Sequence, residues 1–348
     1  MSRIHALDAA RASLLLLGVL FHAAVFVYLY QKPASVSEFL FVAYTNQVLH
    51  VFRMPAFFLI SGFFAAYLVS SRGAGSYLAN RLGRIALPLI IFWLPVTFAN
   101  NWSSQGAWIT GRSTFEILPV DFQHLWFLYF LIFFSFVFVL LTRLVKLEKL
   151  PNIHPAVAMV LMALLMPLLP SVLNDQGELG TSTVLFPEPG LLAWYFWVFL
   201  AGAIAFHQKD SWLGFLRNRA VLLTTLFLLV FTLFFFSQDT GWELVGATYG
   251  VAAALGSFGV IGLFLRFADR PSKIMRFLSD ASYWLYLVHL PLVFFFLFSL
   301  GTNGFGAIAT ILLTSVLTIV IGLVTYKVFV RHTFISTLLN GKRHPLKS

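Results

Sequence analysis

The residues of this chain that most suggest chemistry are ionisable side chains inside long apolar segments. Arg11 and His22 stand eleven residues apart in LDAARASLLLLGVLFH. On an α-helix this spacing is about three turns, so both side chains share one face with a rise of roughly 16 Å between them. Asp8 and Gly18 fall on the same face. Imidazole can act as a base near neutral pH, so we expect His22 to do chemistry. The alternative is a structural network in which His22 donates to a neighbouring carbonyl.

A second segment repeats the pattern, with polar residues in HVFRMPAFFLISGFF and just before it. Asn46, His50, Arg53 and Ser61 recur at helical spacing. Arg53 could extend to lipid headgroups at a membrane surface. With His50 one turn away, however, both can point inward at a polar or anionic substrate, which is the interpretation that we prefer.

A third candidate is the pair Arg81 and Arg84 in NRLGRIALPL. Two guanidinium groups at i and i+3 suit bidentate recognition of phosphate, and a helix N-terminus adds partial positive charge. From charge alone, ordinary anchoring on the cytoplasmic side of a membrane is the interpretation of these residues that we would prefer.

Three further residues complete the candidate substrate-binding set. His124 and Trp126 begin an apolar segment in QHLWFLYF, and His289 precedes Pro291 in SYWLYLVHLPLV. Trp126 could belong to an aromatic belt at the membrane surface, and His289 could be a core residue bonded to backbone that the proline frees.

The spacing of the histidines does not support a metal site. The sequence has no phosphate-binding glycine loop, dinucleotide fingerprint, metalloprotease motif or nucleophile elbow.

The elements that must position these residues are membrane-spanning helices. Of the 348 residues, 59% are apolar and 10% are charged, against about 45–50% and about 25% in soluble proteins. This composition excludes a water-soluble globule and a disordered chain. A span needs roughly 20 apolar residues, and we predict ten, over 12–30, 46–69, 84–100, 124–142, 155–173, 190–207, 219–236, 244–265, 282–300 and 306–327. The predicted fold is an all-α polytopic membrane protein with no appended soluble domain.

The distribution of basic residues predicts the orientation. With the N-terminus in the cytoplasm, the outside loops hold only Lys32 and Arg112 of the 23 lysine and arginine residues. Cytoplasmic loops carry such an excess of positive charge, so we expect both termini inside. The net charge of +10 is therefore a topology signal, and we expect no nucleic-acid partner. Asp8 and Arg11 flank an apolar run too long for a cleavable signal, so the first segment is expected to be retained.

Five blocks in this order resemble the membrane acyltransferase-3 family: LDAARASLLLLGVLFH, HVFRMPAFFLISGFF, NRLGRIALPL, HLWFLYFL and SYWLYLVHLPL. Arg11 and His22 fit that family's Arg-x10-His motif, and Arg81 and Arg84 fit its Arg-x-x-Arg motif. Within the family, the chain looks closest to the glucans biosynthesis protein C branch, which succinylates periplasmic glucans. The resemblance implies an acyltransferase domain over 1–330 and a short basic cytoplasmic tail over 331–348.

The resemblance also implies the reaction and its partners. The enzyme would sit in a bacterial inner membrane and move a succinyl or acetyl group from cytoplasmic acyl-CoA to a hydroxyl of an outside carbohydrate. His22 takes the catalytic role, and Asp8 and Arg11 fix the geometry of the first helix or the nucleotide end. Arg81 and Arg84 face the donor phosphates. Arg53, His50 or Ser61 could stabilise the tetrahedral intermediate. Acyl-CoA would be a co-substrate, with no tightly bound cofactor. The competing hypothesis is a transporter or flippase of an anionic metabolite.

Overall fold

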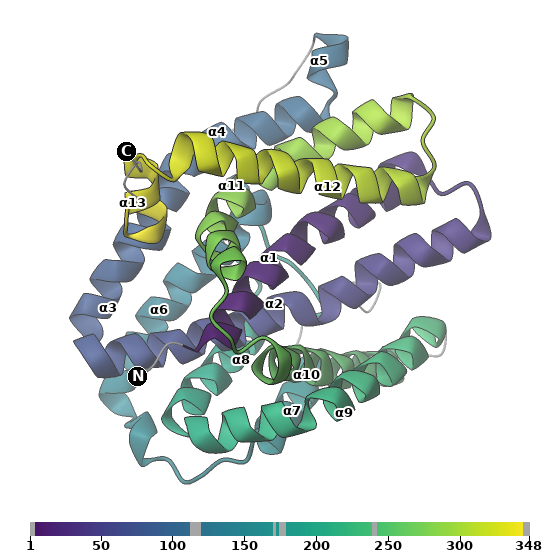
Figure 1. Ribbon diagram of the computed structural model, residues 1–348. Helices are drawn as coiled ribbons and strands as arrows, with labels where there is room; N and C mark the ends of the chain where they lie inside the picture. Colours follow the sequence, from purple (N-terminus) through teal and green to yellow (C-terminus); the bar gives the residue numbers. More distant parts are fainter. Residues whose placement is uncertain (1–3, 112–119, 170–171, 174–178, 239–241, 344–348) are drawn as a thin grey trace.

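Figure 1 shows the computed structural model of the chain. The structure describes residues 4–111, 120–169, 172–173, 179–238 and 242–343. Arg112 of the predicted outside loop and residues 344–348 of the predicted tail lie outside this described part.

The apolar segments fold as helices, because a chain inside lipid must satisfy every backbone N–H and C=O group within the segment itself. The described residues contain no β-strand, only two isolated bridges. The helices are α1 (His5–Phe26), α2 (Val36–Arg72), α3 (Ala74–Arg81), α4 (Leu87–Ser104), α5 (Ala107–Thr110), α6 (Trp126–Leu144), α7 (Pro155–Leu168), α8 (Pro189–His207), α9 (Lys209–Phe236), α10 (Trp242–Phe267), α11 (Lys273–Thr302), α12 (Ala307–Thr325) and α13 (Phe334–Asn340).

Within the described ranges, nine helical stretches are long and apolar enough to cross a membrane. This confirms the prediction of an all-α polytopic membrane protein. The predicted span over 155–173 differs, because α7 has only 14 residues and rises about 21 Å, less than the roughly 30 Å of a bilayer core. The physical reason is Pro170: the residue before a proline is driven out of helical geometry, and Leu169 is indeed extended.

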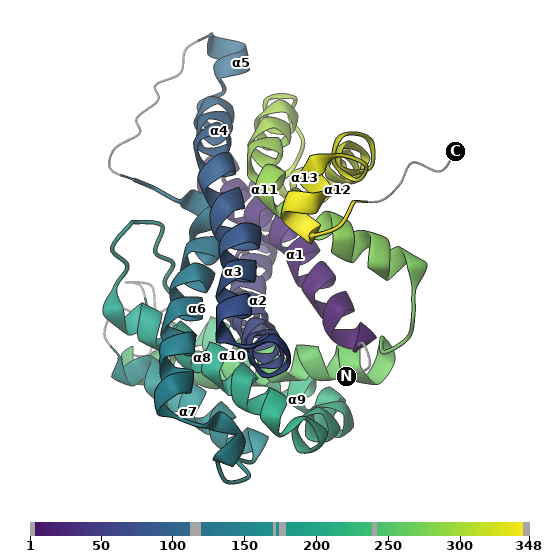
Figure 2. The same ribbon diagram turned by 90° about the vertical axis from the view of Figure 1, so that its left-hand side faces the viewer.

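The helices form two groups on either side of α1 and α2 (Figures 1 and 2). Helices α7, α8, α9 and α10 gather on one side, and α4, α11 and α12 lie on the other. The long helix α2 packs on α8 and α10, whereas α1 lies between α2 and α11. The predicted chemistry-bearing segments therefore occupy the middle of the bundle.

Close packing between α2 and α8 depends on two glycines. A Cβ atom on Gly62 would lie 1.8 Å from the carbonyl oxygen of Phe199, and one on Gly202 would lie 1.8 Å from that of Leu59. Only glycine permits this approach of two helix backbones, as is common between membrane helices. This contact fixes α2, and with it the polar residues that α2 carries.

One end of the bundle collects the starts of several helices. In the turn between α10 and α11, Asp269 accepts hydrogen bonds from the backbone N–H of Ala6 at 3.1 Å and from Arg217 at 2.9 Å. These bonds join the start of α1 and the N-terminal part of α9 to the turn between α10 and α11. The same end of the bundle holds Arg72, the last residue of α2, and Lys209, the first residue of α9. We call it the basic end.

Candidate active site

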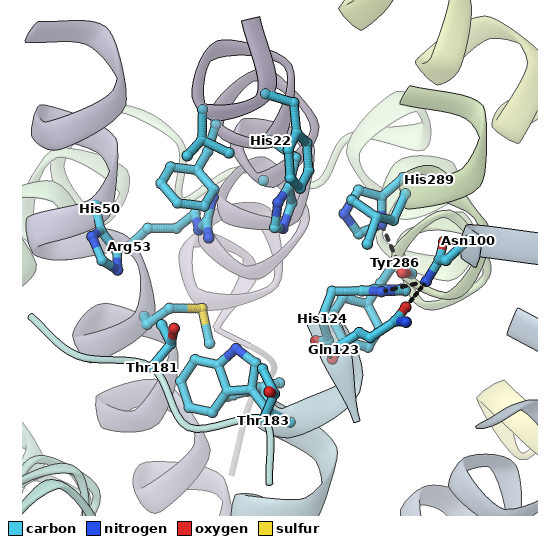
Figure 3. Close-up of a pocket in the computed structure, with 18 of the residues that line it drawn as sticks. His22, His50, Arg53, Asn100, Gln123, His124, Thr181, Thr183, Tyr286 and His289 are labelled. Carbon is cyan, nitrogen blue, oxygen red and sulfur yellow. Dashed lines mark hydrogen bonds between the residues drawn. The ribbon is translucent and has the colours of Figure 1, made fainter. Parts of the chain in front are cut away.

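A cavity of about 440 Å³ lies between α1, α2, α4, α6 and α11, and we call it the histidine cavity (Figure 3). Four histidines line it: His22 from α1, His50 from α2, His124 from the 3-10 turn η3 (Gln123–Leu125) and His289 from α11. All four were predicted site residues. The structure therefore brings together side chains that lie up to 267 positions apart in the sequence.

Three of these imidazoles form a tight cluster. The ring centroids of His22 and His289 are 5.0 Å apart, those of His124 and His289 are 4.9 Å apart, and those of His22 and His124 are 6.5 Å apart. The described residues contain no group of three His, Cys, Asp or Glu residues arranged to hold a metal ion. The cluster is instead an arrangement of rings that could share or pass protons.

His124 is held at both ring nitrogens. Its Nε2 lies 3.3 Å from the carbonyl oxygen of Leu287, which can only accept, so Nε2 carries the proton. That carbonyl is available because its usual helical partner is residue 291, which is a proline without an N–H. Nδ1 is then an acceptor and lies 3.5 Å from the amide nitrogen of Asn100. The hydroxyl of Tyr286 also donates to the His124 carbonyl at 2.6 Å. His124 is therefore a fixed, positioning side chain.

His289 and His22 keep nitrogen atoms available. The Nδ1–H of His289 donates to the carbonyl of Tyr286 at 2.7 Å, which leaves Nε2 as an acceptor. This Nε2 atom and Nδ1 of His22 are buried and have no hydrogen-bond partner in the described part of the chain. A buried polar atom without a partner costs free energy, which a bound substrate group would recover.

Arg53 is a buried cation on the same cavity wall. Its side chain is 6% exposed, and its guanidinium lies over the ring of Phe21 at 4.1 Å. Its Nη1 atom is buried without a hydrogen-bond partner. The described residues that line the cavity include no Asp or Glu. The cavity thus presents an uncompensated positive charge, which favours an anionic group or a developing negative charge.

Several polar residues of this cavity were not predicted from the sequence. These are Asn100, Gln123, Thr181 and Thr183, which line it beside Asn46, a residue that its helical spacing with His50 and Arg53 had already indicated. Asn100 donates to the side chain of Gln123, whose backbone has φ 47°, in the left-handed region that is strained for a residue other than glycine. An asparagine in an apolar span was the signal that could have indicated Asn100. Trp126 also lines the cavity and is only 7% exposed, so it does not belong to a lipid-facing belt.

A second cavity, of about 280 Å³, lies toward the basic end and contains Arg11, Arg81 and Arg84. We call it the arginine cavity. Arg81 donates from Nη2 to the Asn80 side chain at 2.8 Å, and its Nε is buried without a partner among the described residues. No Asp or Glu belongs to the described lining of this cavity. Three guanidinium groups that line one cavity form a site suited to phosphate.

The two cavities meet at a single layer of side chains. Leu15, Phe57, Phe127 and Tyr286 line both of them, and we call these four residues the partition. The ring centroids of Phe57 and Phe127 are 5.1 Å apart, and those of Phe127 and Tyr286 are 6.3 Å apart. The predicted stripe on α1 therefore extends through both cavities, with Arg11 on one side of Leu15 and His22 on the other.

Two predicted site residues lie away from the histidine cluster. Ser61 lines the arginine cavity and not the histidine cavity. It is four residues beyond Phe57 on α2, so the partition separates it from His22. Asp8 lies near the start of α1 and belongs to the described lining of neither cavity.

Fold and cavities together define a polytopic membrane protein with a buried imidazole site next to a basic site. Residues 4–327 match the sequence model of the acyltransferase-3 family, described as an acyltransferase domain. The chain belongs to this family, and it is an acyltransferase. This confirms the family and the enzyme class predicted from the sequence. No curated protein and no solved structure matches the chain.

Proposed function

We propose that this acyltransferase moves a succinyl group from acyl-CoA in the cytoplasm to a hydroxyl of a carbohydrate outside the bacterial inner membrane. The observation that carries the proposal is the partition: a basic cavity and an imidazole cavity abut through four shared side chains. The resemblance to the glucans biosynthesis branch makes a periplasmic glucan the acceptor to test first.

The direction of transfer follows from charge. The basic end faces the cytoplasm if the chain obeys the positive-inside rule, and both termini are then cytoplasmic. The arginine cavity opens the donor path on that side, where Arg11, Arg81 and Arg84 would bind the CoA phosphates. The acyl end of the donor would cross the partition to reach the histidine cavity.

The chemistry needs a base, and His22 is the candidate. A ring nitrogen of His22 accepts the proton of the acceptor hydroxyl. At the same time the hydroxyl oxygen attacks the carbonyl carbon of the thioester, and a C–O bond forms. The C–S bond then breaks, and the imidazolium returns the proton to the departing CoA thiolate. His289, 5.0 Å away between ring centroids, can relay that proton. In the alternative order, His22 first takes the acyl group itself and then passes it to the hydroxyl.

The buried cation selects the acyl group. Acetyl brings no charge that would need Arg53, whereas the free carboxylate of succinyl would neutralise its guanidinium in a site with no lining acid. Ser61 lies on the other side of the partition. The hydrogen bond to the oxyanion of the tetrahedral intermediate would then come from His50, three residues before Arg53 on α2. Its Nε2 is buried without a partner in the described structure.

The test uses acyl-CoA labelled in its acyl part. Purified enzyme in proteoliposomes with glucan in the opposite compartment should place the label covalently on the glycan, and His22→Gln should not. Mass spectrometry of envelope glycans from cells with and without the gene would report the acyl mass and the acceptor. Label found only as a free small molecule across the membrane would contradict the proposal and favour a transporter.

A further inference from the structure

The last helix, α13, lies beyond residues 4–327, the part of the chain that matches the family, yet it contributes to the arginine cavity. Leu339 and Asn340 line this cavity together with Arg84. The sequence had suggested only a basic tail here. In Figure 1, α13 lies next to the start of α11 and close to the α3–α4 segment, which carries Arg81 and Arg84.

The segment around α13 is anchored on α11. The side-chain amide of Asn340 donates to the backbone carbonyl of Asp280 at 2.8 Å, and Lys342 forms an ion pair with the Asp280 carboxylate at 2.9 Å. Ser336 donates to the carbonyl of Lys342 at 2.9 Å, and Leu339 is 2% exposed. Several independent contacts therefore hold one short segment at a fixed place.

Gly341 brings the backbone of this segment against Arg84. It ends α13 with φ 69°, a left-handed conformation that favours glycine. A Cβ atom built on Gly341 would lie 3.1 Å from Cζ and 3.3 Å from Nε of Arg84. The guanidinium of Arg84 is therefore confined by a backbone that has no side chain at this point.

Arg84 is also held from the other side. Its backbone carbonyl accepts a hydrogen bond from the Tyr283 hydroxyl at 3.0 Å, and Tyr283 belongs to the same cavity lining. The Arg84 side chain thus extends into the arginine cavity between α11 and the C-terminal segment. Residue Tyr283 of α11 holds the Arg84 backbone, and the guanidinium lies against the C-terminal segment at Gly341.

We propose that residues 334–342 form part of the donor site, in which Gly341 and Asn340 are positioning residues that hold the Arg84 guanidinium toward the donor phosphates. The inference rests on the proposed use of acyl-CoA. Because the guanidinium is already fixed before the donor binds, phosphate recognition costs less conformational entropy. Perturbing the segment should therefore weaken donor binding while leaving the acceptor side unchanged.

The matched pair for the test is Gly341→Ala and Gly304→Ala. Both glycines have left-handed φ, 69° and 78°, so both substitutions strain the backbone, but nothing lies within 4 Å of a Cβ on Gly304. Coenzyme A binding to the full-length purified protein and the KM for donor and acceptor are measured. We expect Gly341→Ala to weaken coenzyme A binding and raise the donor KM roughly tenfold, with the acceptor KM within about twofold of wild type. Gly304→Ala should change neither.

Asn340→Ala, which removes a bond to Asp280 without straining the backbone, provides a second and milder variant. It should shift the donor KM in the same direction. Wild-type affinity for coenzyme A in both Gly341→Ala and Asn340→Ala would overturn this inference while leaving the proposed function intact. A wild-type protein that binds no coenzyme A would overturn the proposed function, and the inference with it.

Discussion

The Nε2–H group of His124 donates to the carbonyl oxygen of Leu287 across 3.3 Å, joining the turn before α6 to the middle of α11. This bond exists because Pro291 offers no N–H to the same carbonyl. The proline thus fixes the tautomer of a histidine more than 160 positions away in the sequence.

Pro291→Ala should loosen His124. The alanine N–H would compete for the Leu287 carbonyl, and the loss of one hydrogen bond of ordinary strength would lower kcat about two- to tenfold. We expect the donor KM to stay unchanged, because the arginine cavity keeps its residues. Pro95→Ala in α4 also replaces a proline inside a helix, but the carbonyl that Pro95 leaves free is that of Ile91, which lines neither cavity in the described structure. An equal loss of kcat in both variants would assign the effect to helix geometry alone.

His22→Gln should remove the base while keeping a side chain of similar size. General-base catalysis contributes about 10²- to 10⁴-fold, so single-turnover transfer should fall by that factor with coenzyme A binding retained. His207→Gln, on α8 and outside the described lining of both cavities, should retain wild-type rates. Retained transfer in His22→Gln would move the catalytic role to another histidine of the cluster, with His289→Gln the next variant to measure.

Arg53→Met should separate activity from stability. The substitution removes a buried charge that no lining carboxylate compensates, so the midpoint of thermal unfolding should not decrease. Succinyl transfer should fall at least about tenfold more than acetyl transfer, since a hydrogen bond to a charged group is worth about 1.5–3 kcal/mol. The measurement is the ratio of kcat/KM for the two donors. An unchanged ratio would show that Arg53 does not recognise the acyl carboxylate.

Phe127→Ala should open the partition. The sequence contains no cysteine, so Thr183→Cys reports on the histidine cavity without background labelling. In the parent protein, which carries Thr183→Cys alone, a charged, membrane-impermeant maleimide should label this cysteine from one side of the membrane. After Phe127→Ala is added, it should label the cysteine from both sides.

The control for this experiment is Phe130→Ala, three residues further along α6. Phe130 is fully buried but lines neither cavity in the described structure, so its removal should leave labelling one-sided. Two-sided labelling of the parent protein would mean that the partition does not separate the cavities.

Helical spacing in the sequence was enough to predict much of this site. The stripe from Arg11 to His22 and the series from His50 to Arg53 each lie on one helix, where periodicity decides which face a residue occupies. The convergence of His124 and His289 on His22 could not be predicted in this way, since it depends on how distant helices pack. Ser61 shows the same limit: its spacing was right, but only the structure shows which side of Phe57 it lines.

Other differences between the prediction and the structure arise from local features that hydropathy and residue spacing do not describe. Hydropathy predicted a full span over 155–173, whereas α7 ends at Leu168 under the influence of the following proline. Asn100 stands in a segment so apolar that a single amide left the prediction of a span unchanged. The role of Gly341 depends on a contact with Arg84 that no spacing rule describes.

The backbone contact between α2 and α8 at Gly62 and Gly202 has a mechanical consequence. Two helices locked at this distance cannot slide past each other without separating, so α2 acts as a stationary frame that keeps Phe57 in place. Any motion that lets an acyl group through would then be made by the other three partition residues, Leu15 on α1, Phe127 on α6 and Tyr286 on α11. The path proposed for the acyl group would then run between one stationary wall, on α2, and the side chains that face it.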